Sequence, residues 1–558
     1  MRIKKALTIL SLLLLSFSII ACSNPAETQT DITTESPSEI PSVITPEDTA
    51  GTSEEEPSES PPVEYKAWED ALTDKLAALD PGPQGAPGPG LTWYQIFVYS
   101  FCDSNGDGIG DLNGITERLG YIKSMGFDGI WLSPIHPSST YHKYNVRDYK
   151  AIDPEYGTQE DFDALIVACD ALGIRVILDL VLNHTDIDHP WFSGHPEYYN
   201  ISDQPGNGNW KRMPDGRYYE CQFWDQMPDL NLDSTELRAE FEDICSYWLT
   251  RGVYGFRLDA LTYFYSGNIE KNVEALRWLK NMTDAIKPGS FLVGEAWDTT
   301  NNLYQYYDSG IDSVFSFPFA GPDGMIARLV LNANGNINDY FRQTEAALDK
   351  AKSYNPGATN APFFTNHDMA RASGFLRRDE NLIKIAWGLS LTQPGDAFLY
   401  YGEELGMSGS GKDENKRAPM FWTDDIHETG MAAGPPEMDA VSHAFPPAVL
   451  QVGDSGSIYS FISSAVRLRS KYPHIGRGTF DVSAVEDSVV DSSNTKAGAV
   501  LRAWQGSEIV VAYNVSSETA VLTLPGTLHD HLSATGKTPS QDGSLLTLPG
   551  FCIAILVL

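Results

Sequence analysis

The chain has few basic residues and few cysteines. Its 39 lysines and arginines stand against 75 aspartates and glutamates, which gives a formal net charge of −36. A field of that sign repels phosphate backbones and argues against nucleic acid as a partner. The six cysteines form no Cys-x-x-Cys pair, so the usual spacing of a zinc site is absent. A disulfide such as Cys221–Cys245 is possible, and the sequence leaves it open.

Long apolar runs are also missing, except near the N-terminus. Residues 6–20 are apolar, follow a basic start, and are too few to span a membrane comfortably as a permanent helix. They predict a signal peptide over residues 1–21. The letters Ile-Ile-Ala before Cys22 resemble the lipobox of bacterial lipoproteins, which implies cleavage there and lipid on Cys22. The alternative is a plain signal peptide with a chance cysteine. We therefore expect an extracellular protein, lipid-anchored to the cell membrane.

The region after Cys22 lacks large apolar residues. Residues 22–64 are rich in Ser, Thr, Glu and Pro, a composition that cannot bury enough surface to fold, and they predict a disordered linker. Residues 66–79 could form a short helix. Pro81–Gly90 repeats Gly and Pro over too short a span for a collagen helix, so we expect a loop.

From Trp93 onward, short apolar runs alternate with amphipathic stretches. This alternation predicts a (β/α)8 barrel over residues 65–475. The expected strands are Trp93–Phe101, Gly129–Ser133, Arg175–Leu182, Gly255–Asp259, Phe291–Glu295, Phe363–Asn366 and Ala397–Tyr401. The expected helices are Ile115–Met125, Gln159–Leu172, Ile269–Ile286, Ile337–Lys352, Leu382–Leu391 and Ser457–Lys471.

Two regions depart from the alternation. Residues 184–234 form a connection too long for an ordinary loop, which predicts an inserted small domain after the third strand. Residues 476–558 contain short β runs separated by turn residues, among them Ala499–Trp504, Glu508–Tyr513 and Thr519–Leu524. They predict a C-terminal antiparallel β-sandwich domain.

Polar residues stand where the predicted strands end, which is the catalytic rim of a barrel. The third strand ends in Asp179, Asn183 and His184, the fourth in Arg257 and Asp259, the fifth in Glu295, and the seventh in Asn366, His367 and Asp368. Each alone could be a polar cap or a structural ion pair. Together they suit glycoside hydrolysis, which needs one carboxylate at the anomeric carbon and one carboxylic acid for the leaving oxygen. Arg257 would keep Asp259 ionised, whereas Glu295 has no cation beside it in sequence and would have the higher pKa.

These segments resemble those of the α-amylase family of glycoside hydrolases over nearly the whole chain from Trp93. The match includes residues 129–134 (Gly-Ile-Trp-Leu-Ser-Pro) and residues 401–404 (Tyr-Gly-Glu-Glu). The resemblance implies the barrel, a domain B after strand three, a C-terminal β domain and retention of anomeric configuration. It implies Asp259 as nucleophile, Glu295 as acid/base and Asp368 as a further catalytic carboxylate that grips the sugar at subsite −1. It implies substrate contacts from Tyr144, His142, His184, Arg257, His367, Asp413 and Arg417.

Four of these contacts rest on two motifs that differ from the family or have another interpretation. In Tyr141-His142-Lys143-Tyr144, a lysine replaces the family's glycine, which leaves the local loop geometry open. Asp413 and Arg417 match a loop after strand eight, although a solvated charged loop is the alternative.

Calcium is the expected cofactor. The run from Asp103 to Asp111 places oxygen side chains at alternate positions with glycines at the bends, which suits a hard cation. It resembles the calcium loop of oligo-1,6-glucosidase-like members, which implies ligands from Asp103, Asn105, Asp107, Ile109 (carbonyl) and Asp111. A plain Asx-turn loop is the alternative. Asn183 and Asp229 match two ligands of a second family calcium site, although the Lys-His after the nucleophile is Thr-Tyr here.

The resemblance also bears on the substrate. Residues 227–231 (Met-Pro-Asp-Leu-Asn) resemble the subgroup between oligo-1,6-glucosidases and neopullulanases, and Ala260 after the nucleophile favours α-1,4 cleavage. The prediction is an endo-acting, retaining hydrolase of starch or maltooligosaccharides. A neopullulanase-like, cyclomaltodextrinase-like or transglycosylating enzyme is the nearest alternative. A non-catalytic glucan-binding protein is disfavoured, because all three carboxylates are present.

Overall fold

The computed structural model describes residues 67–79, 90–425, 427–485, 488 and 494–558. The predicted signal peptide, the lipidated Cys22, the linker over 22–64 and nearly all of the Pro81–Gly90 loop lie outside these residues. All of the described residues belong to one compact unit, Pro62–Leu558. Within the described part of the chain, no helix has both the length and the apolarity to cross a membrane.

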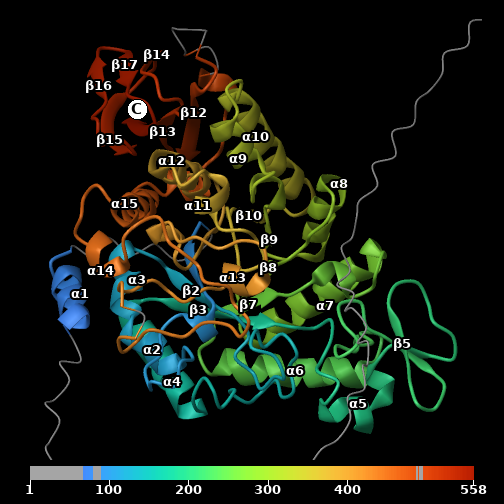
Figure 1. Cartoon of the computed structure of the whole chain (residues 1–558). Coiled ribbons are helices and arrows are strands. Elements are labelled where there is room, and N and C mark those ends of the chain that lie inside the picture. The colour runs from blue at the N-terminus through green and yellow to red at the C-terminus, as the bar shows by residue number, and fades with distance from the viewer. Residues whose placement is uncertain (1–66, 80–89, 426, 486–487, 489–493) are drawn as a thin grey trace, which may run out of the picture. The chain divides into compact units, whose positions relative to one another are not determined.

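Eight parallel strands form the barrel, as predicted (Figure 1). In sheet order they are β10, β9, β8, β7, β3, β2, β1 and β11. The amides of Asp396 and Phe398 donate to the carbonyls of Asn360 and Pro362, both at 2.8 Å, and so join β11 to the other end of the sheet. The bounds are β1 Thr92–Ile96, β2 Gly129–Leu132, β3 Arg175–Leu180, β7 Gly255–Leu258, β8 Phe291–Gly294, β9 Ser313–Phe315, β10 Thr359–Ala361 and β11 Ala397–Tyr400.

Three barrel strands differ from the sequence prediction. β1 ends at Ile96, and Val98–Ser100 is a 3-10 turn; this run is apolar because it is buried, not because it is a strand. The seventh strand is Thr359–Ala361, so Phe363–Asn366 follows it as buried irregular chain. The sequence did not predict the sixth strand, β9, because a strand of three residues is too short to show an alternating apolar pattern.

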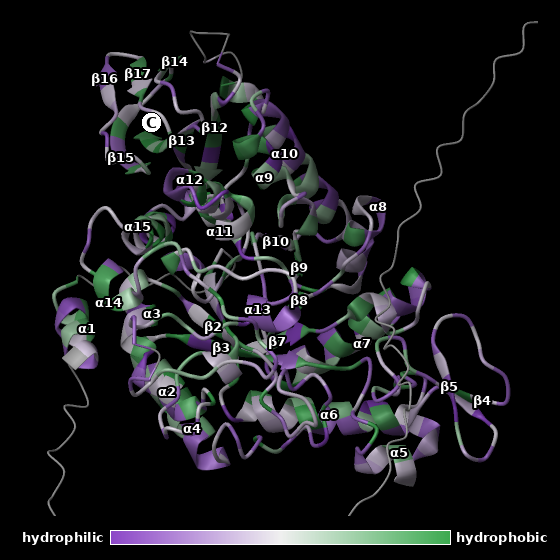
Figure 2. Cartoon of the chain, viewed as in Figure 1, coloured by the Kyte–Doolittle hydropathy of each residue, from purple (hydrophilic) through white to green (hydrophobic). Residues whose placement is uncertain are grey.

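Helices surround the barrel, and Figure 2 shows their mixed colouring against the more hydrophobic strands β2 and β3. The helix predicted over Ile115–Met125 is two helices that meet at Arg118. Thr158 and Asp161 form a capping box at the start of α4, and Gly173 ends that helix in the left-handed conformation. The helices are α1 Ala67–Ala77, α2 Leu112–Glu117, α3 Leu119–Met125, α4 Gln159–Leu172, α6 Thr235–Thr250, α7 Ile269–Ile286, α8 Thr300–Leu303, α9 Met325–Leu331, α10 Ile337–Tyr354, α11 Ala372–Phe375, α12 Glu380–Leu391, α13 Asp413–Lys416, α14 Ala448–Gln451, α15 Ile458–Lys471 and α16 His474–Arg477.

The long connection after β3 carries its own small sheet. It contains α5 (Pro190–Gly194) and the strands β4 (Ile201–Ser202), β5 (Trp210–Arg212) and β6 (Tyr218–Glu220), ordered β4-β6-β5. An isolated bridge pairs His184 with Asp229 at its base. Ser234 then caps α6. This is the inserted domain B of the predicted fold class.

The C-terminal region is an antiparallel sandwich of two sheets, ordered β12-β13-β18-β15 and β14-β17-β16. Side chains such as Val510, Leu522 and Leu546 fill the space between the sheets. The strands are β12 Ala497–Trp504, β13 Ser507–Asn514, β14 Ala520–Thr523, β15 Thr527–Ser533, β16 Ser540–Asp542, β17 Leu545–Leu548 and β18 Cys552–Val557.

The five cysteines of the described residues are all buried thiols. The possible disulfide between Cys221 and Cys245 is therefore not formed. Cys245 lies inside α6 and packs in the barrel core, whereas Cys221 follows β6 in domain B. Burial raises the pKa of the Cys221 thiol to about 11, which keeps it protonated at neutral pH.

Candidate active site

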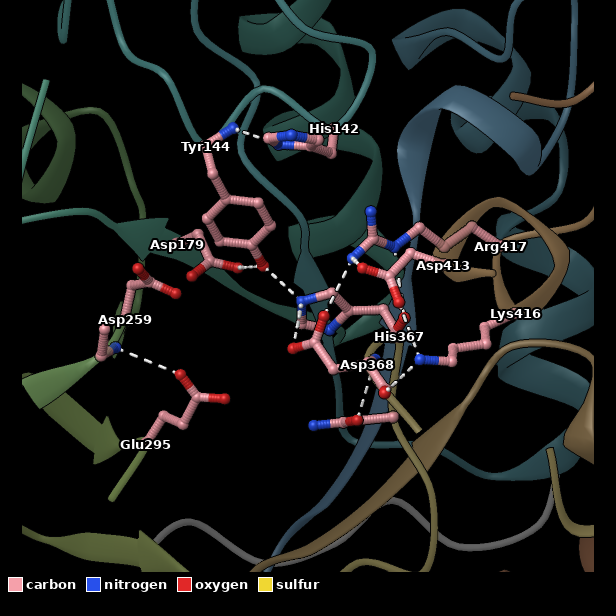
Figure 3. Close-up of polar contacts among 12 residues, drawn as sticks. His142, Tyr144, Asp179, Asp259, Glu295, His367, Asp368, Asp413, Lys416 and Arg417 are labelled. Atoms are coloured by element: carbon pink, nitrogen blue, oxygen red, sulfur yellow. Dashed lines mark hydrogen bonds and ion pairs between the residues drawn. The ribbon is translucent and has the colours of Figure 1, made fainter. Parts of the chain in front are cut away.

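The predicted catalytic carboxylates meet at one end of the barrel (Figure 3). Asp259 directly follows β7 and Glu295 directly follows β8, so the parallel sheet sets them side by side. Asp368 arrives from the loop after β10. The side chains of Asp259 and Glu295 are 11% exposed, and that of Asp368 is 31% exposed. All three line one cavity of about 640 Å³.

Arg257 connects two of the three carboxylates. Its Nη1 donates to Oδ1 of Asp259 at 2.7 Å, and its Nη2 lies 2.9 Å from Oε2 of Glu295. Nη1 also pairs with Asp179, whose other oxygen accepts from Trp131 Nε1 at 2.9 Å. The sequence predicted the contact with Asp259. Glu295 has no cation beside it in sequence, and the fold brings the same guanidinium to it as well.

The pKa of Glu295 is nevertheless raised. Burial raises it most, Arg257 lowers it, and the charges of Asp259 and Asp368 raise it again, with the result at about 7. The amide of Ala260 donates to Oε2 at 3.1 Å. A carboxyl group that holds its proton near neutral pH suits a general acid.

Asp368 has the opposite electrostatic setting. Burial would raise the pKa of this carboxyl, but His367 and the guanidinium of Arg417 hold it at about 2. Arg417 Nη2 donates to Asp368 Oδ1 at 2.9 Å. These two of the three acidic groups in the cavity therefore differ: Glu295 keeps a proton, and Asp368 stays ionised.

His367 is held as a neutral ring. Burial lowers its pKa to about 3. The side-chain amide of Gln95 lies 2.8 Å from Nδ1, and with that amide donating, the ring proton is on Nε2. Nε2 lies 2.8 Å from the hydroxyl of Tyr144 and 3.1 Å from Asp368. Sequence reasoning missed Gln95, which lies inside β1 with its side chain directed to the cavity end of the barrel.

Tyr144 and His142 line the same cavity. The Tyr144 ring stacks on His367 with an interplanar angle of 7° and centroids 5.5 Å apart. His142 Nδ1 accepts the amide of Tyr144 at 3.2 Å. Lys143, whose replacement of glycine left the loop geometry open, takes a left-handed φ of 62°.

His184 offers the cavity an unused polar atom. The ring is 2% exposed, and its Nε2 has no hydrogen-bond partner. Nδ1 of His184 lies 3.4 Å from the side-chain nitrogen Nδ2 of Asn183. A buried nitrogen left unpaired in a cavity wall is ready for a ligand hydroxyl, since leaving it unpaired is costly.

The cavity continues into a second hollow of about 840 Å³, because His142, Tyr144 and Trp224 line both. Arg417 and Asp413 line this second hollow. Asp413 pairs with Lys416 at 2.7 Å and is not among the residues of the carboxylate cavity. The carboxylate cavity and the second hollow therefore form one longer groove.

Exposed aromatic rings rim the carboxylate cavity, and the sequence did not predict any of them as a substrate contact. They are Phe223 (48% exposed), Trp224 (49%), Tyr263 (42%) and Trp297 (59%). Trp297 stacks on Phe317 with centroids 5.0 Å apart. Large aromatic residues in long polar connections were the available signal, since such rings seldom stay exposed without a binding partner.

The predicted first calcium loop folds around its own carboxylates. Asp103 accepts the amides of Asn105, Gly106 and Gly108 at 3.1, 2.7 and 2.7 Å. Asp111 caps α2. Among the described residues, no group of three or more His, Cys, Asp or Glu side chains is arranged to hold a metal. The side-chain oxygens of this loop are of the kind that calcium binds. However, its acidic side chains are not gathered around one common point.

The predicted second calcium site has one suggestive feature. Asn183 Nδ2 donates to Asp229 Oδ1 at 3.2 Å where domain B meets the barrel. Burial raises the pKa of the Asp229 carboxyl to about 8. A cation bound there would favour the ionised carboxylate. In this structure, however, Asn183 presents its side-chain nitrogen to Asp229, and not the oxygen that a metal would bind.

Residues 95–478 match the model of the α-amylase catalytic domain. Alpha-amylase 3 of Dictyoglomus thermophilum is 40% identical over 349 residues, which cover 60% of this chain and 68% of that protein. Trehalose synthase/amylase TreS of Mycolicibacterium smegmatis is 31% identical over 70% of this chain and 77% of its own. The solved structure of Eubacterium rectale Amy13B superposes with a TM-score of 0.81 at 37% identity, covering 89% of this chain and 99% of that one.

Proposed function

The chain belongs to the α-amylase family of glycoside hydrolases, and within that family we propose that it is an endo-acting, retaining hydrolase of α-1,4-glucans. The observation that carries the proposal is the shared guanidinium of Arg257. Its two terminal nitrogens contact Asp259 and Glu295, so the two carboxyl groups lie close together. Retaining enzymes space this pair at about 5 Å, and inverting enzymes at about 6.5–9.5 Å to admit a water.

The chemistry then follows from the protonation states. Asp259 attacks the anomeric carbon while Glu295, which holds its proton near neutral pH, protonates the departing glucosidic oxygen. The covalent glycosyl–Asp259 ester is next attacked by water, which Glu295 deprotonates. Asp368, kept ionised beside Arg417, accepts hydrogen bonds from the sugar hydroxyls. His184 Nε2 is free for another hydroxyl.

The groove supports endo action over removal of single terminal glucoses. The leaving group must lie beside the acid Glu295, so the part of the cavity with Tyr263 and Trp297 takes the reducing-side sugars. The second hollow, with Tyr141 and Arg417, takes the non-reducing side. A site open in both directions accommodates the interior of a chain.

The test is product analysis on soluble starch and on pullulan, with Asp259→Asn as the control variant. Maltose and maltotriose from starch alone, absent with Asp259→Asn, are the expected result. Panose from pullulan would indicate a neopullulanase-like enzyme instead. No product from either polymer would contradict the proposal.

A second candidate is a transglycosylating enzyme. It is favoured by the exposed Trp297, which stacks on Phe317 at the leaving-group side and offers a platform for an acceptor sugar. Relatives named trehalose synthase also match the chain. Incubation with concentrated maltotriose separates the two: products longer than maltotriose that disappear in Trp297→Ala would favour transfer over hydrolysis.

We also propose calcium at Asp103–Asp111 and at Asn183 with Asp229, and a lipid anchor at Cys22. The calcium proposal is supported by donor type and, at Asp229, by the buried carboxyl. The anchor is supported by the sequence alone. Cys22→Ser would release an anchored enzyme into the medium, whereas unchanged fractionation would contradict the anchor.

A further inference from the structure

Lys143 has an unusual conformation beside the active site. It stands between His142 and Tyr144, which both line the carboxylate cavity. Its φ is 62°, a left-handed value that few residues other than glycine adopt, yet only 2% of the residue is exposed. A buried lysine in a disfavoured backbone region persists only where the surroundings hold it.

Two acidic residues hold Lys143. Its Nζ lies 2.8 Å from Oδ2 of Asp153 and also pairs with Glu155. The ammonium sits 5.2 Å from the ring centre of Tyr156. The side chain of Asp153 is 6% exposed, and that of Glu155 is 47% exposed. Lys143 is therefore the cation of a buried ion pair, and removing it would leave Asp153 buried without that partner.

This ion pair has a geometric consequence for the cavity. The left-handed backbone at Lys143 sends its side chain toward Asp153, away from the cavity, while the residues on either side face the cavity. Figure 3 shows His142 beside Tyr144, whose hydroxyl points to His367 and Asp179. The backbone amide of Tyr144 donates to Nδ1 of His142, so the His142 ring is held against the backbone of the same turn.

We propose that Lys143 is a positioning residue for the reaction. Its ion pair with Asp153 and Glu155 holds the turn of His142 and Tyr144 in the conformation that grips the sugar ring attacked by Asp259. The proposal rests on the proposed glucan hydrolysis at this site. We call the ion pair of Lys143 with Asp153 and Glu155 the tether. The proposal predicts that the tether, and not the left-handed backbone alone, supports catalysis.

Lys143→Gly tests the tether, because glycine adopts φ of 62° without strain and carries no charge. Arg377→Gly is the matched control, since Arg377 has the same φ of 62° but is exposed. We expect Lys143→Gly to lower kcat about 10- to 100-fold, as misplacement by about 1 Å does. KM for starch should change less than about threefold, because sugars along the groove still bind. Arg377→Gly should keep wild-type kinetics.

Two more variants separate positioning from stability. Lys143→Arg restores a cation and should recover kcat to within about fivefold of wild type. Glu155→Gln removes only the half-exposed partner and should lower kcat about two- to fivefold. If Lys143→Gly melts below the assay temperature, the kcat of Glu155→Gln alone tests whether the ion pair supports catalysis. A lower melting temperature with wild-type kcat in both Lys143→Gly and Glu155→Gln would overturn the proposal.

The role of Lys143 can be tested even if the proposed function is wrong. If wild type does not cleave starch, all variants are assayed on 4-nitrophenyl α-maltoside or on pullulan, whichever the wild type cleaves. Absence of starch cleavage by wild type contradicts the α-1,4-amylase proposal. Equal kcat of wild type and Lys143→Gly on the working substrate contradicts the role of Lys143.

Discussion

The proton held by Glu295 makes a quantitative prediction for the pH dependence of the reaction. As the proposed general acid, Glu295 must be protonated in the free enzyme, and burial together with the Asp259 and Asp368 charges raises its pKa to about 7. At pH 7 about half of the molecules then carry the proton. With the ordinary value of 4.5, about 0.3% would, which is roughly 150-fold fewer.

We therefore expect kcat/KM to hold up to about pH 7 and to fall about tenfold for each further pH unit. Initial rates on maltopentaose at concentrations well below KM, from pH 5 to pH 9, measure this dependence. The decrease lies on the alkaline side because deprotonation removes the acid.

Glu295→Gln with α-maltosyl fluoride provides the control, because fluoride departs without a proton from the enzyme. The first step should persist in this variant, and its rate should show no decrease near pH 7. A wild-type kcat/KM that already falls about tenfold for each pH unit from pH 5 upward, as an ordinary carboxyl would give, would refute the assignment of Glu295 as the buried acid. A decrease near pH 7 that remains in Glu295→Gln would refute it as well.

Three further predictions concern stability. Arg257→Met leaves Asp179, Asp259 and Glu295 without their shared cation and should lower the free energy of unfolding in urea by about 3–5 kcal/mol at pH 7. Glu295→Gln should be stabilising, increasingly so from pH 5 to about pH 7 and then by a constant amount. The folded pKa of Glu295 is raised from 4.5 to about 7, so wild type loses stability as pH rises between these two values. Calcium in excess over a chelator should raise the melting temperature, as expected for a ligand that binds only the folded state.

Each of these has a result that contradicts it. Unchanged urea stability of Arg257→Met would mean that the carboxylates find other compensation. A stability difference between Glu295→Gln and wild type that is constant from pH 5 to pH 8 would exclude a raised pKa. Identical melting curves with calcium and with chelator, for chelated and dialysed protein, would exclude the metal sites.

The sequence predicted the barrel and the positions of the candidate catalytic carboxylates along it. Asp259 and Glu295 directly follow apolar strands, and the ends of neighbouring parallel strands meet at one edge of the sheet. This inference needs only local periodicity and chain order. The same reasoning failed at β9 and at Phe363, where the strand is short or the apolar run is buried irregular chain.

Closure of the barrel decided what the sequence could not. Arg257 reaches Glu295 as well as Asp259, and the pKa of Glu295 still rises because the closed rim removes it from water. Lys143 finds Asp153 only once the loop after β2 folds back. The physical reason is that periodicity and turn preferences act within a few residues, whereas burial and charge pairing depend on distances that exist only in the folded chain.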